Sequence, residues 1–179
     1  MQPRGDNLAR APQLERRRVR VRGLVQGVGF RPHVFRCAAR FGVSGFVGNG
    51  PEGVVIEAQG EAIDAFLAAL QEQAPPLARI DSVIQAPMAL VDENGFAIAA
   101  TVAGAAAGAA IPADTALCDT CLAELFTPGD RRYLHPFIAC CDCGPRFTMT
   151  RRLPYDRDTT SMADFTLCPA CEDEYSNPM

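Results

Sequence analysis

The sequence predicts an α+β fold, in which two helices cover one face of an antiparallel sheet, followed by a small cysteine-rich unit. Over residues 16–100, strand-like and helix-like apolar patterns succeed one another in the order β-α-β-β-α-β. Seven of the eight cysteines lie after position 117, where this periodicity weakens. With 179 residues, 48% of them hydrophobic, the chain is long enough for a compact domain and a smaller second unit.

The first strand and the first helix flank a glycine-rich loop. Residues 16–25 alternate and are β-branched, which predicts a strand. Its exposed face is expected to carry Arg16, Arg18, Arg20 and Arg22. After the loop at 26–31, Pro32 suits the first turn of a helix, and apolar residues recur at helical spacing until Gly42 ends it.

The remaining elements complete the sheet. The apolar runs 43–50 and 53–60 are separated by turn residues and predict a hairpin. Residues 61–73 place large apolar side chains on one face of a helix, which a Pro-Pro pair ends. Residues 78–86 and 95–100 predict the last two strands.

The same patterns predict the organisation of the chain. We expect an N-terminal extension at 1–15, a domain at 16–100, an Ala/Gly linker at 101–114 and a cysteine-rich region at 115–179 that needs a metal to fold. No apolar run is long enough to span a membrane, and the N-terminus lacks the apolar centre of a signal peptide. These observations predict a cytoplasmic protein.

The glycine-rich loop is a candidate phosphate site. Glycines allow positive φ, so successive N–H groups can converge on one anion, and the helix that follows adds its unpaired N–H groups and dipole. Arg31 adds a guanidinium that can bind two phosphate oxygens. The candidate phosphate-binding residues are Gln26, Gly27, Val28, Gly29, Phe30 and Arg31. A G-x-G turn before a helix is, by itself, equally typical of a plain tight turn.

The strings "GLVQGVGFR" at 23–31 and "GFVGNG" at 45–50 carry a resemblance to the acylphosphatase family over residues 16–100. The resemblance implies a ferredoxin-like fold and hydrolysis of acyl phosphates, with Arg31 binding the phosphoryl group and Asn49 positioning the attacking water. An acyl phosphate is already activated, so this reaction needs no protein nucleophile. Asn49 is neutral, so it would orient the water rather than act as a base.

Two further residues lie near the loop. We expect His33 at the surface or rim of the site rather than in catalysis, and Cys37 as a small buried apolar residue.

Two C-x-x-C pairs predict a metal site. Cys118 and Cys121 are followed, after 18 residues, by Cys140 and Cys143, which together supply the four thiolates of a tetrahedral structural zinc. Without an export signal, metal binding is favoured over disulfides, and a redox or iron–sulfur role is the alternative. Cys141 is out of register and is expected to be a bystander.

Cys168 and Cys171 form a third pair after a further 24 residues. This spacing, together with residues 131–175, resembles the zinc-finger region of the HypF family of hydrogenase-maturation carbamoyltransferases. In that family an acylphosphatase-like domain comes first, a fourth cysteine pair closes a second zinc site, and two further domains carry out adenylation and transfer. We therefore expect an N-terminal portion of such an enzyme, truncated before its last cysteine pair. The third pair would either share a zinc between two chains or lie in a disordered end.

The resemblance implies that carbamoyl phosphate is hydrolysed at the phosphate loop. It also implies that the carbamate passes to the missing domains, which would activate it with ATP. The carbamoyl group would then be transferred to a cysteine of a partner protein in [NiFe]-hydrogenase maturation. One alternative is a general acylphosphatase with a zinc appendage. The other is a zinc-ribbon module that binds nucleic acid, which the net charge of −4 disfavours. Its candidate residues are Arg131, Arg132, Arg146, Arg151 and Arg152. Replacing Cys118 is expected to unfold the second unit without affecting hydrolysis.

Overall fold

The computed structural model describes residues 13–50, 52–99, 113–138, 140, 143–144, 147–153 and 155–176. Residues 1–12 of the expected extension and 101–112 of the expected linker lie outside the described residues, as do Cys141 and Arg146. Among the described helices, none combines the length and the hydropathy that a membrane span requires.

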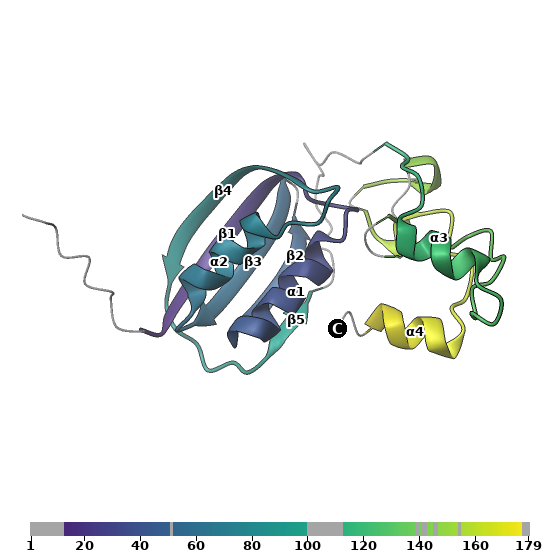
Figure 1. The fold of residues 1–179 in the computed structure, drawn as a ribbon. Coiled ribbons are helices and arrows are strands. Elements are labelled where there is room, and N and C mark those ends of the chain that lie inside the picture. Colours follow the sequence, from purple (N-terminus) through teal and green to yellow (C-terminus); the bar gives the residue numbers. More distant parts are fainter. Residues whose placement is uncertain are drawn as a thin grey trace, which may run out of the picture.

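A five-stranded sheet with two helices on one face forms the first part of the chain (Figure 1). Its strands are β1 (Glu15–Leu24), β2 (Ser44–Gly50), β3 (Gly53–Gly60), β4 (Arg79–Met88) and β5 (Phe96–Ile98), and its helices are α1 (Phe30–Phe41) and α2 (Ile63–Glu72). The strand order is β4-β1-β3-β2-β5. The predicted α+β fold and its order of elements are therefore confirmed.

The sheet differs from the prediction at one edge, because it is not wholly antiparallel. β1 pairs antiparallel with both β3 and β4, and β2 pairs antiparallel with β3. β5 instead runs parallel to β2, with Gly45 opposite Phe96. After β4 closes one edge of the sheet, the chain crosses to the other edge and enters β5 in the direction of β2.

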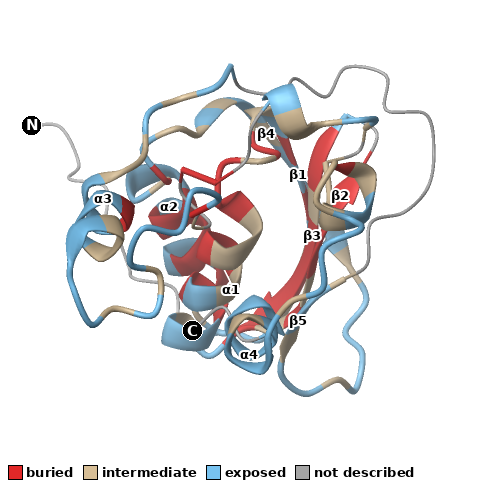
Figure 2. Ribbon diagram, turned by 90° about the vertical axis from the view of Figure 1, so that its right-hand side faces the viewer, coloured by how far each residue is buried: buried red, intermediate tan, exposed pale blue. Residues whose placement is uncertain are grey.

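The core lies between the sheet and its two helices, and Figure 2 shows buried residues, in red, in both layers. In β1, Val19 and Val21 are almost fully buried and lie opposite Ile56 and Val54 of β3. Their alternation with polar neighbours follows from the two-residue period of a strand. Each fully buried side chain of this size contributes about 1.5–3 kcal/mol to folding.

Arg16 corrects one sequence expectation about β1. Arg18, Arg20 and Arg22 are exposed as predicted, but Arg16 is only 6% exposed. Its guanidinium forms ion pairs with Glu57 and Glu93, which enclose it. A buried cation is tolerated here because two carboxylates neutralise it.

The cysteine-rich region contains little regular structure. Its elements are α3 (Asp119–Phe126), the short 3₁₀ helices η1 (Phe147–Met149) and η2 (Arg157–Thr159), and α4 (Pro169–Ser176). The buried cluster is small and consists of Cys121, Ile138 and Cys143. Phe126 and Phe147 are 62% and 61% exposed, so apolar burial alone does not account for the stability of this region.

Candidate functional site

The loop between β1 and α1 has the backbone geometry of an anion site. Gly27 and Gly29 adopt φ of 69° and 73°, a region that favours glycine. α1 begins at Phe30, and the N–H of His33 donates to the carbonyl of Gly29. The described part of the chain offers no backbone acceptor to the N–H groups of residues 27–30. These donors are therefore available to an anion at the positive end of the helix dipole.

Buried side chains hold this loop in place. Val28 and Phe30 are 0% and 1% exposed and belong to the core between sheet and helices. The buried side chain of Gln26 donates from Nε2 to the carbonyls of Gly50, at 3.0 Å, and Gly53, at 2.9 Å. Gln26 thus joins the loop to the β2–β3 hairpin, on which Asn49 lies.

Arg31 stands at the start of α1, with a side chain that is 20% exposed. Its Nη1 lies 3.6 Å from Oδ2 of Asp156, a distance typical of a loose ion pair rather than a hydrogen bond. Since a guanidinium has five N–H donors, this contact leaves others for an anion. Arg31 can therefore still bind phosphate oxygens, as the sequence analysis expects.

Asn49 is 2% exposed near the end of β2. Its Nδ2 donates to the carbonyl of Tyr155 at 3.2 Å. Its Oδ1 is buried and accepts no hydrogen bond from the residues that the structure describes. A buried acceptor of this kind needs a partner, and a water molecule would satisfy it.

Sequence reasoning missed Tyr155 and Asp156, which contact the two residues expected in hydrolysis. The only local signal was a capping motif, because Asp156 and Thr159 form a capping box at the start of η2. That motif predicts a helix start, but not that the residue faces Arg31.

His33 corrects another expectation, because it is 7% exposed rather than at the surface. Its ring packs 6.1 Å from that of Phe30, between centroids, and its nitrogens lie 3.8–3.9 Å from the sulfur of Cys37. Cys37 is buried as expected, and burial raises the pKa of its thiol. Both side chains are therefore buried, and Cys37 belongs to the core between the sheet and the helices.

Four cysteines converge on a metal site in the second unit. The sulfurs of Cys118, Cys121, Cys140 and Cys143 all lie within 4.8 Å of one another. The sulfurs of the first pair each contact a sulfur of the second pair, at 3.7 Å from Cys118 to Cys140 and 3.6 Å from Cys121 to Cys143. Burial and the neighbouring sulfurs raise the pKa of the Cys121 thiol, whereas the burial of Cys143 is outweighed by hydrogen bonds within the cluster, which lower its pKa. Four thiolates this close together repel one another, so a cation is needed to hold all four in the charged form.

Cys168 and Cys171 lie apart from this cluster. Among the described residues, no group of three or more metal-binding side chains includes them. Cys168 is exposed, and hydrogen bonds with Cys171 lower its pKa. The sulfur of Cys171 accepts a hydrogen bond from Arg131 at 3.1 Å. Their assignment as metal ligands stays a prediction.

Three of the five arginines of the nucleic-acid alternative form ion pairs with carboxylates. Arg131 forms an ion pair with Glu174, and Arg132 with Glu124 and Glu174. Arg151 lies 3.4 Å from Asp164. Guanidinium groups with carboxylate partners of this kind are poorly placed to neutralise phosphates, so this reading loses support.

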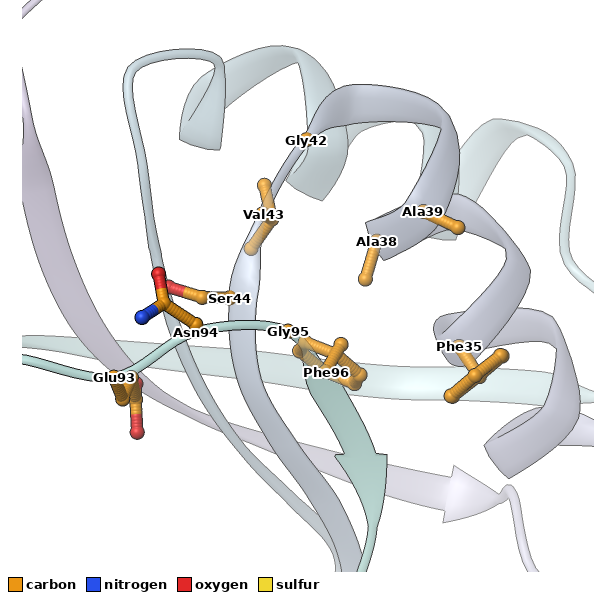
Figure 3. Close-up of a pocket in the computed structure, with 10 residues that line it drawn as sticks. All are labelled: Phe35, Ala38, Ala39, Gly42, Val43, Ser44, Glu93, Asn94, Gly95 and Phe96. Atoms are coloured by element: carbon orange, nitrogen blue, oxygen red, sulfur yellow. The ribbon is translucent and has the colours of Figure 1, made fainter.

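A cavity of about 450 Å³, shown in Figure 3, has no residue of the phosphate loop in its lining. It is lined by the second half of α1, by residues 42–44 and by residues 93–96. Phe35 and Phe96 pack edge to face beside it, and Glu93 already pairs with Arg16. We assign it no chemistry, because it brings together no pair of groups suited to binding or catalysis.

Two family profiles match separate parts of the chain. The acylphosphatase profile matches residues 17–98, and the HypF finger profile matches residues 117–150. The acylphosphatase of Caldivirga maquilingensis is 38% identical over 86 residues, which cover 45% of this chain and 90% of the relative.

Longer relatives match nearly the whole chain. Carbamoyltransferase HypF2 of Cupriavidus necator is 53% identical over 165 residues, or 89% of this chain and 20% of the relative. A crystal structure of full-length HypF in a phosphate- and nucleotide-bound form superimposes with a TM-score of 0.86 and 38% identity, covering 95% of this chain and 23% of the other. The chain therefore spans about a fifth of the length of these curated relatives.

Proposed function

Because the chain belongs to the acylphosphatase family through its first domain and is a homologue of HypF carbamoyltransferases along most of its length, we propose that it hydrolyses carbamoyl phosphate. The supporting observation is the loop at 26–31, where the N–H groups of residues 27–30 find no backbone acceptor among the described residues and lie beside Arg31 at the start of a helix. Such a site suits a phosphoryl group, which carries two negative charges and several acceptor oxygens.

In the proposed reaction, the loop and Arg31 bind the phosphoryl group and neutralise its charge. Oδ1 of Asn49 accepts a hydrogen bond from a water molecule and directs a lone pair of that water at phosphorus. A P–O bond forms to water as the bond to the carbamoyl oxygen breaks, and carbamate leaves. Asn49 is too weak a base to take the proton, which a phosphate oxygen can accept.

We propose, further, that the four-cysteine site holds zinc. In a tetrahedral site with Zn–S bonds of about 2.3 Å, neighbouring sulfurs lie about 3.8 Å apart. The sulfurs of Cys140 and Cys143 are 3.7 Å apart, and the other contacts are similar. Four thiolates leave no open coordination position, so the metal would stabilise the second unit and take no part in the reaction.

The wider role is also a proposal. The longer relatives are named carbamoyltransferases, and hydrolysis of carbamoyl phosphate would be one step of carbamoyl transfer. The carbamate would then be activated elsewhere in the enzyme and transferred to a partner protein during [NiFe]-hydrogenase maturation. We likewise propose the division into a domain at 16–100 and a zinc-stabilised unit at 115–179, and a cytoplasmic location.

Phosphate release from carbamoyl phosphate and from acetyl phosphate tests this proposal. The wild-type chain is expected to release phosphate from carbamoyl phosphate faster than the spontaneous reaction does. Its kcat/KM should be higher for carbamoyl phosphate than for acetyl phosphate. A higher kcat/KM for acetyl phosphate would favour a general acylphosphatase. No enzymatic release from either substrate would contradict the assignment.

A further inference from the structure

Two consecutive residues of the second unit contact the two residues to which we assign hydrolysis. The carbonyl of Tyr155 accepts the hydrogen bond of Asn49 at 3.2 Å, and the carboxylate of Asp156 lies 3.6 Å from the guanidinium of Arg31. Residues 155 and 156 lie outside the ranges that the acylphosphatase and HypF finger profiles match. An acylphosphatase that ends with the first domain has no counterpart of this segment.

Asp156 is held by its own unit. Its Oδ1 accepts hydrogen bonds from the N–H of Arg157 at 2.8 Å and from the hydroxyl of Tyr175 at 3.2 Å. Partial burial and the Asp156 charge raise the pKa of Tyr175 to about 12, so this hydroxyl remains a donor at neutral pH. With Oδ1 fixed in this way, Oδ2 is directed at Arg31 before any substrate binds.

For Arg31, a carboxylate on one side restricts a long, flexible side chain. Asp156 lies near Nη1, so Nη2 and Nε remain as donors for phosphate oxygens. The ion pair favours one orientation of the guanidinium, so the bound phosphoryl group meets Arg31 in the geometry that stabilises its charge during the reaction. The same carboxylate also places a negative charge near the substrate, and this repulsion opposes the benefit.

For Asn49, the contact with Tyr155 decides which end of the amide faces the water. Because Nδ2 donates to the Tyr155 carbonyl, Oδ1 is the atom left for a water molecule. Because Oδ1 accepts a hydrogen bond from one proton of the water, a lone pair of the water oxygen remains available to attack phosphorus. A reversed amide would donate to that lone pair and impede the attack.

We propose that Tyr155 and Asp156 complete the hydrolytic site as positioning residues, through Asn49 and Arg31 respectively. This inference rests on the proposed function of those two residues. It makes the cysteine-rich unit a part of the hydrolytic site rather than a separate appendage, and it reverses the expectation that hydrolysis is independent of that unit.

Kinetics of Asp156→Asn in the full chain test the proposal. Asparagine retains an oxygen that can accept from the N–H of Arg157, so the capping contact is preserved while the charge facing Arg31 is lost. We expect kcat for carbamoyl phosphate to fall on the order of 10-fold, with KM unchanged or lower and Tm unchanged. Asp158→Asn is the matched control, since Asp158 is exposed on the same short helix and should leave kcat unchanged.

The possible results separate this inference from the proposed function. If wild type and Asp156→Asn share the same kcat, or if the variant has a higher kcat, the positioning role is wrong although hydrolysis stands. If wild type releases no phosphate, the proposed function fails and this inference fails with it. Should Asp156→Asn be unstable, Asp156→Ser also keeps a good N-cap without the charge, and the same fall in kcat is expected.

Discussion

The side-chain amide of Asn49 donates a 3.2 Å hydrogen bond to the main-chain carbonyl of Tyr155, 106 residues further along the chain. This bond joins β2 to the segment that precedes η2 and leaves Oδ1 of Asn49 as the acceptor for a water molecule. The proposed hydrolytic site therefore consists of a phosphate loop and an asparagine from the first domain, positioned by residues of the second.

Replacing Arg31 by alanine is expected to abolish phosphate binding and to reduce hydrolysis by about 100-fold or more, because no other residue of the loop carries a positive charge. The fold should be retained, since the side chain is partly exposed outside the core. Calorimetric titration with inorganic phosphate and a phosphate-release assay measure both effects. Arg20→Ala, an exposed arginine of β1, is the control; wild-type phosphate affinity in Arg31→Ala would refute the assignment.

Asn49→Ala is expected to lower kcat by about 100-fold while KM changes by less than about 3-fold, because the asparagine positions water and makes no contact with the phosphoryl group. Steady-state kinetics on carbamoyl phosphate give both constants. Asn94→Ala, in an exposed loop, should behave like wild type. Losses of equal size in kcat and in substrate affinity would contradict the water-positioning role.

Gln26→Ala tests the connection between the phosphate loop and the hairpin. Two buried carbonyls, those of Gly50 and Gly53, lose their donor, so the free energy of unfolding should fall by about 1–3 kcal/mol. KM should also rise, because the loop is less fixed. Urea unfolding measures the first effect. Gln71→Ala, whose side chain is exposed on α2, should change stability by less than about 0.5 kcal/mol, and an equal loss in both variants would argue against the connection.

We expect the wild-type chain to bind about one zinc ion. Cys118→Ser removes one of its four ligands and is expected to release the metal. The second unit should then unfold, and hydrolysis should fall as well, because Asp156 is no longer held beside Arg31. Metal analysis after gel filtration measures the loss. Cys37→Ser, a buried cysteine of α1 far from the cluster in sequence, should retain the metal; full metal content in Cys118→Ser would show that the four-cysteine site is wrongly assigned.

Local patterns in the sequence predicted most of the fold. Alternation predicted β1, glycine predicted the end of α1 at Gly42, and the turn residues predicted the β2–β3 hairpin. The parallel pairing of β5 was missed, because the direction of an edge strand depends on where the chain crosses the sheet. The burial of Arg16 was also missed, since it requires carboxylates from β3 and from the segment before β5.

The candidate site was predicted in the same uneven way. Cysteine spacing predicted which four sulfurs converge. The two cysteines of each C-x-x-C pair are close in sequence, so the fold has only to bring one pair next to the other. The loop at 26–31 was equally local. Tyr155 and Asp156 could not be predicted, because their role depends on how the second unit lies against the first, and no spacing in the sequence encodes that contact.

A crystal structure of the chain with bound inorganic phosphate tests the central claim most directly. We expect the anion at the N-terminus of α1, within hydrogen-bonding distance of N–H groups of residues 27–30 and of Arg31, with a water molecule donating to Oδ1 of Asn49. Asn49 and Arg31 should still contact Tyr155 and Asp156. Phosphate bound elsewhere, or Oδ1 of Asn49 turned away from the anion, would contradict the account.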